Sequence, residues 1–162
     1  MIILQTKTTI QASQERCFDL ARSVDLHAAG AAGIAGRAMA GRTTGLSDLG
    51  DRTTWTARFF GLGFALTTEV TGFDRPHGFS DAQCSGPFAH FGHVYGFREA
   101  GKGRTVMTDV FSFQSPFGLI GALFDSVVLR GRMQVVMEAR AITIRRAAES
   151  PPPPILGESE QT

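Results

Sequence analysis

The chain has 162 residues, of which 43% are hydrophobic and 19% are charged, a composition that excludes a disordered chain and favours one globular domain. Its 16 Lys and Arg residues nearly balance its 15 Asp and Glu residues, so we expect no nucleic-acid partner and no general attraction to an anionic membrane. No stretch approaches the roughly 18 consecutive apolar residues of a membrane span, and the first residues alternate instead of forming a signal peptide. We therefore expect a cytoplasmic protein without stable membrane insertion, with Cys17 and Cys84 as buried thiols.

The first predicted element is a strand over residues 2–12, which alternate in polarity and carry β-branched side chains. Ser13 then offers a helix N-cap, and residues 13–30 predict one or two short helices. A break rich in glycine and alanine follows at residues 30–36. Further strands are predicted in an antiparallel meander, separated by turn residues, at 37–44, 52–61, 62–73, 78–85, 88–99 and 104–114.

From Phe117 to about Ala147 the pattern predicts one long helix, roughly 45 Å in length. We expect its apolar stripe, spaced at three- and four-residue steps, to face the sheet. The stripe consists of Ile120, Phe124, Val127, Val128, Gly131, Val135, Ala139 and Ile142. A glycine in mid-helix costs about 1 kcal/mol relative to alanine, and at Gly131 the alternatives are close packing or drift, or room left for a ligand. The Pro-rich tail at 149–162 is predicted to be disordered, which leaves residues 1–148 as the single domain.

The stretch GPFAHFGHVYGF at residues 86–97 suggests a binding site. Phe91, His93, Tyr95 and Phe97 occupy every second position of this predicted strand, so they share one face of the sheet. A plain core would favour Val, Ile and Leu at such positions. Large rings with two polar tips are typical of a cavity wall, and we expect this face to look toward the long helix.

One group of residues could carry acid–base chemistry. Asp109 falls on the inward parity of the neighbouring strand, so it is expected near His93 and Tyr95. Burial would raise the pKa of this carboxyl group, and the Asp109–His93 pair could then exchange protons near neutral pH. The alternative is that Asp109 only satisfies the hydrogen-bonding needs of buried groups. Asp81 is a weaker candidate for the same cluster.

No metal site or cofactor is predicted. His90 and His93 are three residues apart on a strand, so they point to opposite faces and cannot bind one ion together. His27 and His77 fall at a helix end or turn and are expected to be solvated. The arginines of the long helix are expected to form a solvated face, namely Arg130, Arg132, Arg140, Arg145 and Arg146.

The order of elements resembles that of the START/Bet v 1-like superfamily (SRPBCC), and particularly its bacterial single-domain members of polyketide cyclase/dehydrase and lipid-transport type. The resemblance is carried by ERCFDLARSVDLH (15–27), AGRTTGLSDLGDRTTWTARFFG (40–61), FDRP (73–76), GPFAHFGHVYGF (86–97) and TVMTDVFSFQSPFG (105–118). It implies an α+β helix-grip fold. In this fold a curved antiparallel sheet of about six or seven strands wraps a long C-terminal helix, two short helices follow the first strand, and a hydrophobic cavity lies between sheet and helix.

Three functions remain open, because this superfamily includes carriers, enzymes and partner-binding proteins. The preferred hypothesis is a carrier or sensor, monomeric or homodimeric, that binds a small hydrophobic molecule of lipid, polyketide or aromatic type. The second is a cyclase or dehydratase that uses His93 and Asp109, with Tyr95, without a metal or nucleotide cofactor. The third is an interaction protein. The residues predicted to line the ligand site are Trp55, Phe59, Leu66, Phe91, Phe97, Met107, Phe111, Phe113, Phe124, Val128 and Gly131.

Overall fold

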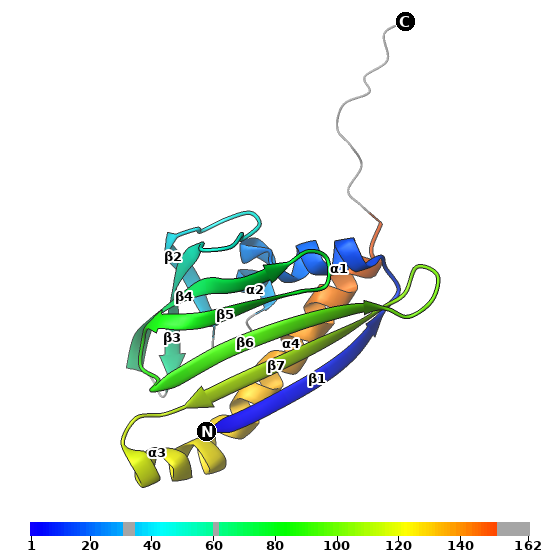
Figure 1. Ribbon diagram of the computed structural model, residues 1–162. Coiled ribbons are helices and arrows are strands. Elements are labelled where there is room, and N and C mark those ends of the chain that lie inside the picture. The colour runs from blue at the N-terminus through cyan, green and yellow to red at the C-terminus, as the bar shows by residue number, and fades with distance from the viewer. Residues whose placement is uncertain (31–34, 60–61, 152–162) are drawn as a thin grey trace, which may run out of the picture.

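A computed structural model describes the backbone of residues 1–30, 35–59 and 62–151, together with their side chains except at 29–30, 35–36, 57–59 and 62. Within this part of the chain, seven antiparallel strands form one curved sheet in the order β1-β7-β6-β5-β4-β3-β2 (Figure 1). The strands are β1 (Ile2–Ile10), β2 (Ala35–Gly41), β3 (Arg52–Phe59), β4 (Leu62–Asp74), β5 (Gly78–Ser85), β6 (His90–Glu99) and β7 (Thr105–Gln114). The helices are α1 (Gln14–Ala21), α2 (Val24–Gly30), α3 (Gly118–Phe124) and α4 (Arg130–Glu149), with a π-helical turn η1 (Asp125–Leu129) between the last two.

The predicted α+β helix-grip architecture is confirmed. Each predicted strand is present with small differences at its ends, and α4 crosses the concave side of the sheet (Figure 1). The predicted N-cap is also present, since the Ser13 hydroxyl accepts a hydrogen bond from the Arg16 N–H at 3.4 Å. The chain therefore begins its first helix where a polar side chain satisfies an otherwise unpaired backbone donor.

The central strands β6 and β7 turn every second side chain toward α4. On β6, His93, Tyr95 and Phe97 are buried, whereas Val94 between them is 52% exposed on the outer face. Burial alternates along the whole of β7 in the same way. Its inward residues are Thr105, Met107, Asp109, Phe111 and Phe113. The predicted inward parity of both strands is thus confirmed.

Helix α1 closes one end of the space between the sheet and α4. The ring of Phe18 is fully buried and packs edge to face against Phe73, Phe79 and Phe97, with centroid distances of 5.2, 5.6 and 5.7 Å. Edge-to-face rings combine large apolar burial with a favourable arrangement of their quadrupoles. This end of the fold is therefore filled by aromatic side chains.

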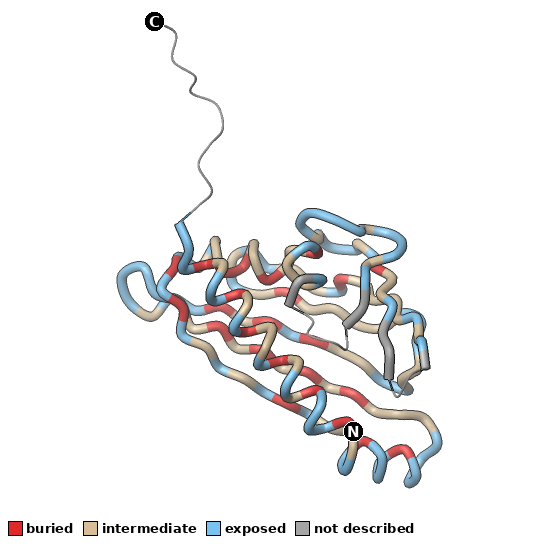
Figure 2. The backbone as a smooth tube through the Cα atoms, turned by 180° about the vertical axis from the view of Figure 1, so that it is seen from behind, coloured by how far each residue is buried: buried red, intermediate tan, exposed pale blue. Residues whose placement is uncertain are grey.

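The predicted long helix is present as α3, η1 and α4 in succession, but the face predicted to be buried is wrong. Ile120, Val127 and Val135 of the predicted stripe are 77%, 73% and 62% exposed. Buried positions recur along the other face of this helix (Figure 2). They are Gly121, Asp125, Leu129, Met133, Met137, Ala141, Ile144 and Ala148.

The spacing of these buried residues explains the error. Through Ala141 they are four residues apart, and each four-residue step along a regular α-helix drifts by roughly 40°. The π turn accommodates more residues per turn and takes up part of that drift. A helix without this turn could not keep Gly121 and Ala141 on one face.

Three further observations complete the fold. Helix α4 ends at Glu149, next to the predicted boundary, and residues 152–162 lie outside the described residues, so the disorder of the tail stays a prediction. Among the described helices, none combines the length and hydropathy needed to cross a bilayer. Cys17 is buried as expected, but Cys84 is exposed, so the prediction of a buried thiol is wrong there.

A pair of truncations tests which helix face supports the fold. Ile144→Ala removes a side chain that is 2% exposed and should lower the free energy of unfolding by about 2–5 kcal/mol. Val135→Ala on the opposite face should change it by less than about 0.5 kcal/mol. Urea denaturation of both variants checks this, and equal losses would contradict the assigned phase of the helix.

Candidate functional site: a cavity between sheet and helix

A cavity of about 170 Å³ lies between the inner face of the sheet and α4. Strands β3 to β7 and the loops beside them provide most of its wall, and α4 covers it. Its apolar lining consists of Val24, Trp55, Phe64, Leu66, Val70, Phe79, Pro87, Phe88, Phe91, Phe111, Met133, Val136 and Met137. Such a concave, ring-rich space with few polar groups is the usual form of a small-molecule site.

The structure places four of the predicted ligand-site residues on this wall. They are Trp55, Leu66, Phe91 and Phe111. Their rings and methyl groups come from β3, β4, β6 and β7, so the wall spans most of the sheet. Phe91 and Phe111 also contact each other, edge to face, with their centroids 4.9 Å apart.

Six other predicted ligand-site residues, all with described side chains, do not line the cavity. Three belong to the packed core instead, namely Phe97, Met107 and Phe113. Three on the long helix lie off the wall, because the helix presents another face: Phe124, Val128 and Gly131. A Cβ at Gly131 would meet no atom within 4 Å, so neither close packing nor room for a ligand explains this glycine. The side chain of Phe59 lies outside the described residues.

His93, Tyr95 and Asp109 form one hydrogen-bonded chain, of which only His93 lines the cavity. Burial raises the pKa of Tyr95 well above its ordinary value, so its hydroxyl keeps its proton and donates to Nδ1 of His93 at 3.2 Å. The Nε2–H of His93 then donates to Oδ1 of Asp109. Both imidazole nitrogens are therefore engaged, and His93 can contact a substrate through a nitrogen only if Tyr95 turns away.

His27 and Arg140 were expected to be solvated, but both lie on the cavity wall. Arg140 projects from α4, and its guanidinium carbon lies 4.8 Å from the centroid of the Tyr95 ring. Its Nη2 donates to Nδ1 of His27 at 2.8 Å, and the His27 ring lies 5.5 Å from that of Trp55. Burial, followed by the charge of Arg140, holds the pKa of His27 well below its ordinary value. His27 is therefore a neutral acceptor.

Asp81 adds a carboxyl group to the same wall. It lies opposite His93 in the register of β5 and β6. Burial raises its pKa, an effect that the positive charge of Arg140 opposes and the negative charge of Asp109 reinforces. No described residue donates a hydrogen bond to it. Asp81 lines the cavity, so its carboxyl group can contact whatever occupies that space.

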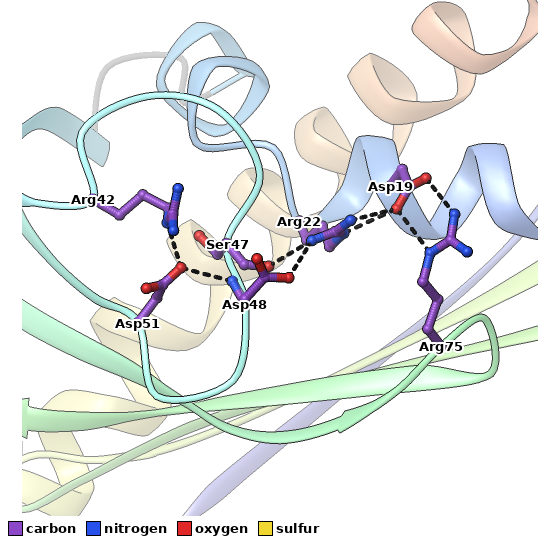
Figure 3. Close-up of polar contacts among 7 residues, drawn as sticks. All are labelled: Asp19, Arg22, Arg42, Ser47, Asp48, Asp51 and Arg75. Carbon is purple, nitrogen blue, oxygen red and sulfur yellow. Dashed lines mark hydrogen bonds and ion pairs between the residues drawn. The ribbon is translucent and has the colours of Figure 1, made fainter.

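An ionic network holds the loop between β2 and β3 at the rim of the cavity (Figure 3). The guanidinium of Arg22 pairs with Asp19 at 2.8 Å and with Asp48 at 2.7 Å, and it donates to the carbonyl oxygen of Ser47 at 3.0 Å. The Arg22 side chain is only 11% exposed, and it also lies over the ring of Phe18. Arg22 and Ser47 line the cavity. The network therefore connects the rim of the site to α1.

Among the described residues, no group of three or more His, Cys, Asp or Glu side chains is placed to hold a metal ion. The predicted separation of His90 from His93 is confirmed, because His90 is exposed and bonds Ser112 at 2.9 Å on the outer face.

Comparisons with solved structures agree on the fold. The protein TTHA0849 from Thermus thermophilus superposes with a TM-score of 0.72 at 15% identity, covering 91% of this chain and 97% of that one. A START superfamily protein from Mycobacterium smegmatis gives 0.65 at 12% identity, with 91% and 97% covered. The ZhuI aromatase/cyclase from Streptomyces sp. R1128 gives 0.61 at 12% identity, with 90% and 94% covered. No family model and no curated protein matches the sequence.

The stability of Asp81 variants should depend on pH. Because the folded-state pKa of Asp81 lies above its ordinary value of 3.8, the folded protein binds this proton more tightly than the unfolded chain. The contribution of Asp81 to the free energy of unfolding therefore falls as the pH rises from about 3.8 through the raised pKa. Asp81→Asn should be more stable than the wild type at pH 7, and this difference should shrink toward pH 4. Urea midpoints at several pH values measure it.

The matched control is Glu99→Gln, since Glu99 is exposed at the end of β6. Its stability difference from the wild type should vary little with pH. A difference at Asp81 that is constant with pH, or that grows toward pH 4, would contradict the assigned environment.

Proposed function

We propose that this chain, which has the START/Bet v 1-like helix-grip fold, binds a small hydrophobic molecule in the cavity between sheet and α4 and acts as a cytoplasmic carrier or sensor. The observation that carries the proposal is the cavity itself. Large side chains surround an unfilled space in a protein whose other end, beneath α1, is densely packed. Cores normally close such spaces, because each void forfeits dispersion contacts.

The volume of the cavity limits the size of the ligand that it can hold. At about 170 Å³ it is close to an engineered protein cavity of roughly 150 Å³ that binds benzene. One substituted aromatic ring or a short acyl chain fits this volume. A longer lipid or a fused-ring polyketide would require the rim to open, and the β2–β3 loop held by Arg22 is the part of the rim that such a ligand would have to displace.

A charge on the wall tests the proposal. Phe91→Asp places a carboxylate against the cavity and should weaken the binding of ethylbenzene by about tenfold or more, because a charge is costly in an apolar site. Phe91 is half-buried, so the variant can keep its fold. Binding is measured by NMR titration of isotopically labelled protein, and circular dichroism checks the fold.

The control is Val94→Asp, which places the same charge on the outer face of the same strand, where Val94 is 52% exposed. Its affinity for ethylbenzene should stay within about twofold of the wild type. No detectable binding to the wild type, or equal loss in both variants, would refute a binding function at this cavity.

The enzyme hypothesis remains as an alternative because His93 on the wall is backed by the buried carboxylate of Asp109. Such a pair can move a proton once Tyr95 releases Nδ1. An aromatase/cyclase among the proteins of the same fold is in keeping with this alternative, although at 12% identity it supports the fold alone.

Exchange of the methyl protons of acetophenone in D₂O tests the alternative, since it needs only a base beside an aryl ketone. If the pair transfers protons, Asp109→Asn should slow the catalysed exchange by about 10²-fold while ethylbenzene affinity stays within about twofold. The exchange is followed by proton NMR. Wild-type exchange no faster than in buffer, or exchange that Asp109→Asn leaves unchanged, would remove the proposed role of the pair.

A further inference from the structure

Arg140 is a half-buried cation without a carboxylate partner among the described residues. A guanidinium offers five N–H donors. Among the described residues, only one donor of Arg140 has a hydrogen-bond acceptor: Nη2 donates to His27. Its Nε is enclosed and has no acceptor there. Burial of a charge in this state costs free energy unless another group compensates for it.

Arg22, the other arginine on the cavity wall, has acceptors for its guanidinium N–H groups. It pairs with Asp19 and Asp48, and a backbone carbonyl accepts a further bond. Arg140 has instead a neutral imidazole and the face of the Tyr95 ring. The two arginines of the cavity wall thus differ in their partners. Arg22 pairs with carboxylates of the protein, whereas Arg140 has no carboxylate partner among the described residues.

The groups around Arg140 do not supply the missing anion. Asp109 bonds His93 through Oδ1, and neither Asp109 nor Asp81 makes an ion pair with Arg140 within the described residues. His27 on α2, and His93 and Tyr95 on β6, complete the surroundings, and neither Tyr95 nor His27 carries a charge near neutral pH. The acceptor that fits here must come from the occupant of the cavity.

We infer that the ligand is an organic anion, a single-ring or short-chain carboxylate whose carboxylate group accepts hydrogen bonds from the Arg140 guanidinium while its apolar part fills the ring-lined space. This inference rests on the binding function proposed above and adds the chemical class of the ligand. Because Nε is enclosed, the carboxylate meets the guanidinium at its Nη edge. Asp81 lies on the same wall, and in its protonated form it donates to the second carboxylate oxygen.

Three probes of one shape separate the possible ligand charges: 4-ethylbenzoate, neutral 4-ethylbenzamide and cationic 4-ethylbenzylamine. Calorimetric titration of the wild type at pH 7 should show 4-ethylbenzoate binding about tenfold or more tightly than 4-ethylbenzamide, as expected for charge-assisted hydrogen bonds to a half-buried cation. The amine should bind most weakly. Tighter binding of the amine would overturn the inference and indicate that Asp81 selects a cation.

Arg140→Met keeps the length and apolar stem of the side chain but removes its charge. It should abolish the preference for benzoate over benzamide by lowering benzoate affinity about tenfold or more. Arg145→Met, at an exposed position of the same helix, should keep the preference. Asp81→Asn should retain benzoate binding, because the asparagine amide keeps an N–H donor at this position and carries no negative charge.

The outcomes distinguish this inference from the function on which it rests. If benzamide binds and benzoate has no advantage, or if the advantage survives in Arg140→Met, the anion class is wrong and the apolar site stands. If neither the three probes nor ethylbenzene binds the wild type, the proposed function fails and the inference fails with it.

Discussion

The alternation of side chains along β6 and β7 is the constraint on which this structure depends. These strands pair along their full length, with Tyr95 opposite Asp109 and His93 opposite Phe111. The period of a strand is two residues, so a slip of one residue would turn the whole inner face to solvent. The same register that buries Phe97 and Phe111 also carries His93 and Asp109 inside, and their polar atoms must then find partners there.

The strands could be predicted from the sequence better than the long helix, for a physical reason. A strand repeats every two residues, so the parity of Phe91 and His93 was readable directly. A helix repeats every 3.6 residues, and the π turn at residues 125–129 shifts this phase in a way that no apolar pattern displays. The buried face moreover includes Gly121 and Asp125, while large apolar residues such as Ile120 are exposed, so hydrophobicity indicated the wrong side.

The candidate site was only partly predictable. Its aromatic wall follows from local alternation, but the contact between Arg140 and His27 joins residues 113 positions apart and belongs to types that are usually solvated. The position of Arg140 on the cavity wall follows from its place beside Ala141, but only once the buried face of α4 is known. What the sequence cannot show is which of two arginines receives carboxylate partners. That depends on the β2–β3 loop reaching Arg22 in three dimensions.

The carboxylate of Asp125 sits within the π turn and bonds both the backbone N–H and the hydroxyl of Ser115, where β7 ends. One turn earlier, Gly121 lies so close to the Pro116 carbonyl oxygen that a Cβ there would collide with it. If residues 125–129 formed a regular α-helix at unchanged chain length, α3 would rotate by roughly 100° relative to α4. A bulkier residue would then be forced against Pro116. The junction between sheet and helix thus depends on the extra residue that the π turn accommodates.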